Sequence, residues 1–147
     1  MSYSARASGL GNAAAYQVSG KPYASASILV PILSEAPYEL AFPTITKFVT
    51  ITNTTTGAPV ALRVGFSALG ITGSVEPAAS APPPDGARDH YFTLDNGESY
   101  TGEFRVSRLY FLSNKKASAP TLSIIAGLTS VPSTDLPYNW SGSAGVG

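Results

Sequence analysis

Val-Ala-Leu-Arg-Val-Gly-Phe-Ser-Ala, residues 60–68, is the stretch that decides the fold class of this chain. Apolar side chains alternate through it with small or polar ones. A period of two residues is the geometry of a β-strand, because successive side chains point to opposite faces. We therefore predict a half-buried strand. Its apolar face comprises Val60, Leu62, Val64 and Phe66, and its other face comprises Ala61, Arg63, Gly65 and Ser67.

Short segments of this kind recur along the chain, and no amphipathic helix interrupts them. About eight antiparallel strands without helices predict an all-β fold, and we expect a single jelly-roll β-sandwich. The immunoglobulin-like alternative lacks its Cys…Trp…Cys pattern, because the chain has no cysteine. The predicted strands span residues 28–33, 38–42, 45–53, 60–68, 90–94, 99–106, 109–112 and 121–128, with 71–75 as a further short candidate.

Three regions are expected along the chain. Residues 1–26 are rich in Ala, Ser and Gly and cannot supply a core face, so we predict an extended N-terminal arm. Residues 27–131 form the jelly-roll domain. Within the domain, residues 76–88 form a Pro-rich loop, either an interaction tip or a tolerated surface insertion. Residues 132–147 form a turn-rich C-terminal tail.

Two local features of the predicted domain concern chain direction. Asp95-Asn96-Gly97 predicts a tight hairpin, because Asn and Gly accept positive φ. The alternation of apolar residues in 109–112 is out of step by one residue with the alternation in 99–106. A bulge or corner near Ser107 would account for this shift.

The composition argues against several classes of partner. Lys+Arg and Asp+Glu balance at nine each among 147 residues, so no basic surplus exists to neutralise phosphates or an anionic membrane surface. Only 12% of the residues are charged while 44% are hydrophobic, which is typical of a chain whose surface is covered by neighbours. A free sandwich coated with Ser and Thr fits equally well. We expect no signal peptide and no membrane-spanning segment, and the lack of cysteine suits a reducing compartment.

Residues for catalysis are scarce. Gly9–Ala14 matches a dinucleotide-binding pattern in letters, but it lacks the preceding strand and the following helix. His90 lies between Asp89 and the predicted hairpin that ends at Ser99, so a triad is conceivable if the strands pair. The single histidine and the lack of cysteine exclude a zinc site. Four acidic residues, Asp85, Asp89, Asp95 and Glu98, do not have EF-hand spacing. We expect no enzyme, cofactor or metal.

Five segments of the chain together carry a family resemblance. They are Ile45-Thr-Lys-Phe-Val-Thr-Ile-Thr-Asn53, Leu62-Arg-Val-Gly-Phe-Ser67, Tyr91-Phe-Thr-Leu-Asp95, Gly102-Glu-Phe-Arg-Val-Ser-Arg-Leu-Tyr-Phe-Leu112 and Ala126-Gly-Leu-Thr129. Together they resemble the single-jelly-roll penton proteins of large icosahedral nucleocytoplasmic DNA viruses, of the phycodnavirus, iridovirus and marseillevirus type. The resemblance covers residues 45–131.

The resemblance implies a structural capsid protein that forms homopentamers at the fivefold vertices of the virion, assembled in the host cytoplasm. It implies contacts with the major capsid protein and minor capsid proteins, and neither nucleic-acid binding nor membrane insertion. Candidate subunit-contact residues are Arg63, Glu103, Arg105, Arg108, Tyr138 and Trp140, although the charged ones could equally be solvated face charges.

The alternative function is a carbohydrate- or receptor-binding β-sandwich, such as a fibre head or a lectin-like module. It would stack a ligand on Trp140 and on exposed tyrosines such as Tyr3, Tyr38 or Tyr138. A second aromatic set is expected to pack in the core instead of forming a sugar platform, because alternation turns several of its members inward. This set comprises Tyr91, Phe92, Tyr100, Phe104, Tyr110 and Phe111.

Overall fold

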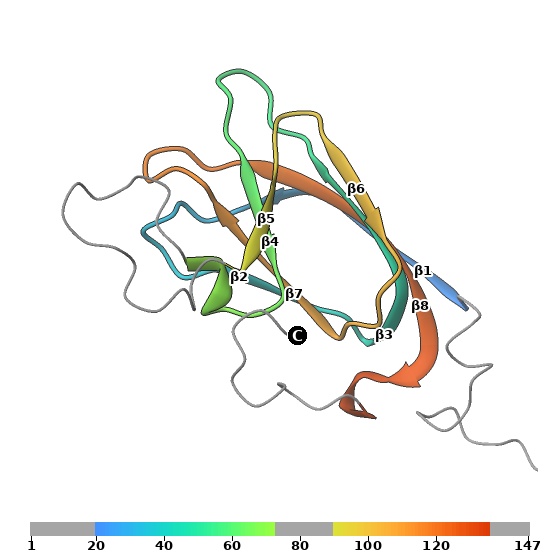
Figure 1. Cartoon of the computed structure of the whole chain (residues 1–147). Helices are drawn as coiled ribbons and strands as arrows, with labels where there is room; N and C mark the ends of the chain where they lie inside the picture. The colour runs from blue at the N-terminus through green and yellow to red at the C-terminus, as the bar shows by residue number, and fades with distance from the viewer. Residues whose placement is uncertain (1–19, 73–89, 136–147) are drawn as a thin grey trace, which may run out of the picture.

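Two four-stranded antiparallel sheets pack face to face (Figure 1). A computed structural model describes residues 20–72 and 90–135 of the chain. Sheet A has the strand order β1-β8-β3-β6 and sheet B has the order β2-β7-β4-β5. The strands are β1 (Lys21–Leu29), β2 (Tyr38–Ala41), β3 (Thr44–Asn53), β4 (Leu62–Gly65), β5 (Tyr91–Leu94), β6 (Ser99–Gly102), β7 (Arg108–Ser113) and β8 (Thr121–Pro132). The prediction of an all-β sandwich is confirmed.

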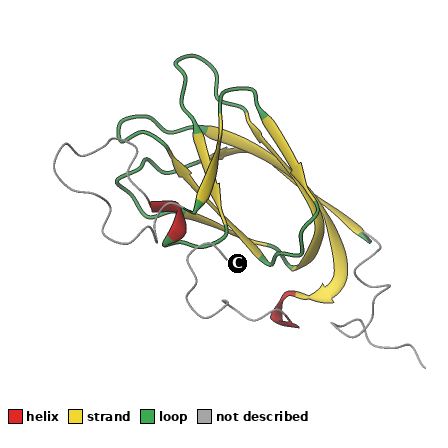
Figure 2. Cartoon of the chain, viewed as in Figure 1, coloured by secondary structure: helices red, strands yellow, loops and turns green. Residues whose placement is uncertain are grey.

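Helical structure in the described residues is confined to two short 3-10 turns, η1 (Gly70–Thr72) and η2 (Ser133–Asp135) (Figure 2). The strands pair in a nested way: β1 with β8, β2 with β7, β3 with β6, and β4 with β5. Two further pairings, β3 with β8 and β4 with β7, complete the sheets. Most ladders therefore join segments that are far apart in the sequence.

The core lies between the sheets because the long strands alternate as β-strands must. In β8, Leu122, Ile124, Ala126 and Leu128 are buried and belong to the central cluster, as the alternation within the predicted strand 121–128 requires. Sheet B contributes inward residues such as Val64 and Phe111 to the same cluster. At about 25 cal/mol per Å² of apolar surface removed from water, this shared layer is the main stabilising term of the fold.

Both lateral openings of the sandwich are closed by aromatic rings. On one side, the ring of Tyr23 in β1 meets that of Phe42, just after β2, at 5.3 Å and an interplanar angle of 80°. On the other side, aromatic residues from β5 and β6 and from the segments after β4 and β6 form a continuous row. Edge-to-face and offset geometries of this kind are favourable because the ring edge is positive and the ring face negative.

The strand that decided the fold class is shorter than predicted. Only Leu62–Gly65 of the predicted segment 60–68 forms β4, and all four of its residues are buried, including those on its polar face. The chain leaves the sheet after Gly65 and turns into η1, so the predicted strand at 71–75 is wrong where it is described: Ile71 is buried within a 3-10 turn. The segment around η1 covers the outer face of β4.

The boundary of the N-terminal arm is also wrong. Residues from Lys21 onward form β1, which pairs with β8, so the described part of the predicted arm is strand. The predicted strand 28–33 overlaps β1 only at its start. A register shift between Ser25 and Ile28, with Ser27 at φ 57°, returns Ile28 to the core side. Residues 1–19 lie outside the described part of the chain.

The turn at Asp95-Asn96-Gly97 is confirmed, but the hairpin is not. Glu98 N donates to Asp95 O at 2.9 Å and Gly97 has φ +80°. The flanking strands nevertheless belong to different sheets, because β5 pairs with β4 and β6 pairs with β3. The shift in alternation near Ser107 also reflects a change of sheet. The chain passes from sheet A to sheet B between β6 and β7, which is the predicted corner.

Two predicted regions are described only in part or not at all. The Pro-rich loop 76–88 lies outside the described residues. The predicted tail begins with Pro132, which is the last residue of β8, and continues into η2.

Candidate functional site

Arg63 was predicted to project from its strand toward a neighbouring subunit, and this prediction is wrong. Its side chain is fully buried on the outer side of β4. Its Nε donates to Asn114 Oδ1 at 2.8 Å and its Nη1 donates to the carbonyl oxygen of Ile71 at 3.0 Å. The guanidinium lies 4.2 Å from the ring centroid of Tyr91. Arg63 therefore links η1 and the residue after β7 to the outer side of β4 by hydrogen bonds.

The remaining charged candidates lie at the surface. Glu103 and Arg105 are exposed in the segment between β6 and β7. Arg108, at the start of β7, donates to Glu39 of β2 at 2.7 Å within sheet B. A partly exposed pair of this kind contributes about 0–1 kcal/mol. Tyr138 and Trp140 lie outside the described residues.

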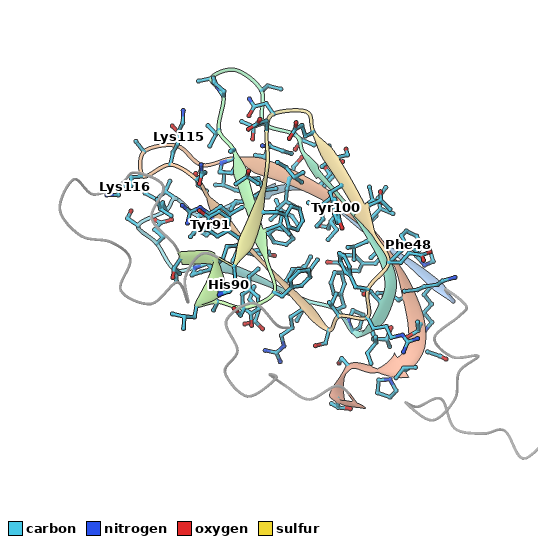
Figure 3. The ribbon with its side chains drawn as sticks, in the orientation of Figure 1. Phe48, His90, Tyr91, Tyr100, Lys115 and Lys116 are labelled. Carbon is cyan, nitrogen blue, oxygen red and sulfur yellow. The ribbon has the colours of Figure 1, made fainter. Side chains whose placement is uncertain are left out.

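The aromatic row at the β5–β6 side joins the two sheets. Phe66 and Phe104 meet edge to face at 5.3 Å, Phe104 and Tyr100 stack at 6.3 Å, and Tyr100 and Phe92 meet at 4.8 Å. Phe66, Phe92 and Phe104 pack against the core. Tyr100 is 39% exposed, so one ring of the row faces solvent (Figure 3).

The predicted packing of the second aromatic set is confirmed for Phe92, Phe104 and Phe111, which contribute to the core. Tyr91 is on the outer side of sheet B, against Arg63, and was not distinguished from the others by the sequence. Tyr38, expected as an exposed stacking residue, is half-buried and packs against the core. The other residues of that expected surface, Tyr3, Tyr138 and Trp140, lie outside the described residues.

The conceivable triad around His90 does not form. His90 and Ser99 cannot pair across a hairpin, because their strands belong to different sheets. The Ser99 hydroxyl lies 2.6 Å from that of Thr52. Within residues 20–72 and 90–135, no group of three or more His, Cys, Asp or Glu side chains is placed to hold a metal ion. No helix in this part of the chain is long and apolar enough to cross a membrane.

The outer face of sheet A is the surface feature that sequence reasoning missed. The outward residues that align across the strands in rows are uncharged. Lys47, which is half-buried at the irregularity of β3 between Thr46 and Phe48, lies outside these rows. Alternation in the sequence marks single outward positions, but the rows depend on register between distant strands. Two of the most exposed large hydrophobic residues lie on this face, Leu29 at 67% and Ile125 at 54%.

Comparison with known proteins identifies no relative. The chain matches no protein-family model, no curated protein and no solved structure. The family resemblance of the sequence therefore stays a prediction, and function has to be argued from the fold and the surfaces of this chain.

Proposed function

We propose that this chain is a structural capsid protein, a single-jelly-roll penton subunit that forms homopentamers at the fivefold vertices of an icosahedral virion. The observation that carries the proposal is the nested pairing of the strands, first with eighth, second with seventh, third with sixth and fourth with fifth. This is the order produced when one long antiparallel hairpin is rolled into two sheets, which is the plan of the jelly roll.

The jelly roll is shared by capsid and lectin domains, so the surface has to favour one of them. Of the residues expected to serve a lectin-like site, Tyr38 is the one that the structure describes, and it packs against the core. The outward rows of sheet A contain no charged residue and include exposed aliphatic side chains, as expected of a subunit that packs against others. These two observations favour assembly over ligand binding.

In the proposed role the chain has no catalytic function and needs no cofactor. Its partners are copies of itself, the major capsid protein and minor capsid proteins, and its location is the capsid vertex of a virion assembled in the host cytoplasm. Closed cyclic symmetry limits the assembly to a ring, because each subunit uses one surface for each of two neighbours. The zero net charge suits association with similar subunits and does not suit nucleic acid.

Multi-angle light scattering of the purified full chain, over a range of concentrations, tests the proposal. Five copies of the 15.2 kDa chain would give a species of about 76 kDa. A trimer would contradict the proposal and favour a fibre head. A monomer at every concentration, combined with selective binding on a glycan array, would establish the lectin-like alternative in its place.

A further inference from the structure

The outer face of sheet A is unusual in carrying aligned rows of uncharged side chains. Ala24, Ile125, Thr50 and Thr101 form one row across all four strands. The neighbouring rows are Pro22–Gly127–Phe48, Ser123–Thr52–Ser99 and Leu29–Thr121. None of these residues is charged, whereas a soluble domain typically has charges at about 25–35% of its surface positions.

Five hydroxyl groups of these rows are already paired with another hydroxyl group of the chain. Thr50 and Thr101 lie 2.9 Å apart and Thr52 and Ser99 lie 2.6 Å apart, hydroxyl oxygen to hydroxyl oxygen. Thr54 donates to the Thr121 hydroxyl at 3.2 Å. A polar group is costly to bury mainly when it loses its hydrogen-bond partner. The face can therefore be covered by a partner that supplies no hydrogen bonds to these pairs.

The chain itself covers part of the other sides of the sandwich. The outer side of β4 in sheet B is covered through Arg63 and Ile71, and the two lateral openings are closed by aromatic rings. The outer face of sheet A has no such cover among the described residues, and Figure 3 shows its residue Phe48 on the opposite side of the sandwich from Tyr91.

We propose that the outer face of sheet A is a contact surface for a second copy of this chain. The inference rests on the proposed function for the choice of occupant and goes beyond it by assigning the surface. Rows without charged residues offer no electrostatic attraction to a nucleic acid or to an acidic or basic protein, and they suit a partner whose net charge is zero, as that of this chain is.

The size of the face is consistent with this occupant. The twelve positions of these rows, with strands about 4.8 Å apart and rows about 6.8 Å apart, span about 390 Å². Each partner in a stable complex contributes about 800 Å². The rows therefore supply about half of one side of a standard interface, and the adjoining edges of β1 and β6 lie next to them to supply the rest.

Arginine substitutions in the full chain test the inference. Ile125→Arg places a charge at the centre of the face, and Ala24→Arg places one beside it on β1. Ala36→Arg, in the exposed turn before β2, makes the same change off the face and is the matched control. Because Ile125, Ala24 and Ala36 are all exposed, thermal unfolding of each variant should match that of the wild-type chain at a concentration too low for assembly.

Light scattering then measures the concentration at which assembly is half complete. We expect Ile125→Arg and Ala24→Arg to raise it by about tenfold or more, because a buried unpaired charge is costly, and Ala36→Arg to leave it unchanged. A wild-type pentamer that persists in both face variants would overturn this inference and leave the proposed function intact. A wild-type dimer that Ile125→Arg dissociates would support the face and contradict the pentamer. A wild-type chain that stays monomeric would overturn this inference, and selective glycan binding by that monomer would overturn the proposed function as well.

Discussion

Replacing Asn53 tests whether one buried amide holds the two sheets together at the end of β3. Its side chain is fully buried. Asn53 Nδ2 donates to the carbonyl oxygens of Val60 and Leu94, both at 2.9 Å, and Oδ1 accepts from Thr55 N at 3.0 Å. Since Asn53 belongs to sheet A and Leu94 to sheet B, these bonds link the sheets directly. The backbone of Asn53 also pairs with Gly97 and Glu98 of the turn before β6.

Asn53→Ala removes three hydrogen bonds, each contributing about 1 kcal/mol net. The carbonyls of Val60 and Leu94 would lose this donor in a buried setting, which moves the cost toward the upper end of the range. We therefore expect a loss of about 3–4 kcal/mol in the free energy of unfolding. A domain stability of about 5–15 kcal/mol makes this a large fraction of the total.

Asn53→Asp keeps the shape but sets a carboxyl against the same two carbonyl oxygens. Burial and these acceptors should raise the pKa of the new carboxyl above its unfolded value, because both disfavour the ionised form. The folded state then binds the proton more tightly than the unfolded state. The added penalty should be absent below the unfolded pKa, about 3.9, and should grow as the pH rises toward the raised folded value.

Denaturant unfolding of the wild-type chain and both variants, at pH 7 and at about pH 4, measures these differences. Thr52→Val is the control: the neighbouring hydroxyl pairs with Ser99 at an exposed position, and its loss should cost about 0.5 kcal/mol. A cost below about 1 kcal/mol for Asn53→Ala would refute the role of the amide as a link between sheets. An Asn53→Asp penalty that is equal at the two pH values would refute the electrostatic argument.

Three further changes follow from the packing. A Cβ at Gly102 would overlap the ring of Phe104, so Gly102→Ala should lower the free energy of unfolding by about 1–3 kcal/mol in a denaturant titration. Arg63→Ala removes two buried charge-assisted hydrogen bonds and should cost about 3 kcal/mol or more, whereas a cost below about 1 kcal/mol would mean that Arg63 does not fasten η1. Deleting residues 1–26 removes most of β1 and should lower the thermal midpoint sharply, while deleting residues 1–19 keeps β1 whole and should shift it by less than about 3 °C.

Much of the fold could be predicted because each of the longest strands has one face toward the core and one toward the outside. In β3 and β8 one face is core and the other is open, so the period of two is visible in the letters. β4 is different: η1 covers its outer side, and both of its faces are buried. Its alternation survives because Arg63 and Gly65 are not apolar, and this is why Arg63 was mistaken for a surface residue.

β1 was missed for the opposite reason. Its sequence, Lys-Pro-Tyr-Ala-Ser-Ala-Ser-Ile-Leu, offers few apolar residues, and only Tyr23 and Ile28 pack against the core. The strand forms because its backbone pairs with β8, more than a hundred residues later in the chain at the Lys21–Leu128 pair. A pairing partner so distant leaves no local signal in the sequence.

The candidate contact surface could be predicted only in its composition. The sequence shows that outward positions are filled by Ser, Thr and small aliphatic residues. It does not show that Thr50 lies between Ile125 and Thr101, because that requires the registers of β3 with both β8 and β6. Glu103 and Arg105 could be predicted as contact candidates, because a charged residue can be identified without knowing how the strands pair.

A subunit contact made by charged residues and one made by the uncharged rows of sheet A should respond differently to salt. This difference shows which of the two forms the contact. A contact made by Glu103, Arg105 and Arg108 would weaken as salt screens its charges. A contact made by the rows around Ile125 has no charge to screen, so we expect its half-assembly concentration to change by less than about twofold between about 0.05 M and about 0.5 M sodium chloride. Because apolar contacts weaken on cooling, the same assembly should loosen at low temperature. Dissociation by salt without an effect of cooling would assign the contact to the charged residues and contradict the role of the sheet A face.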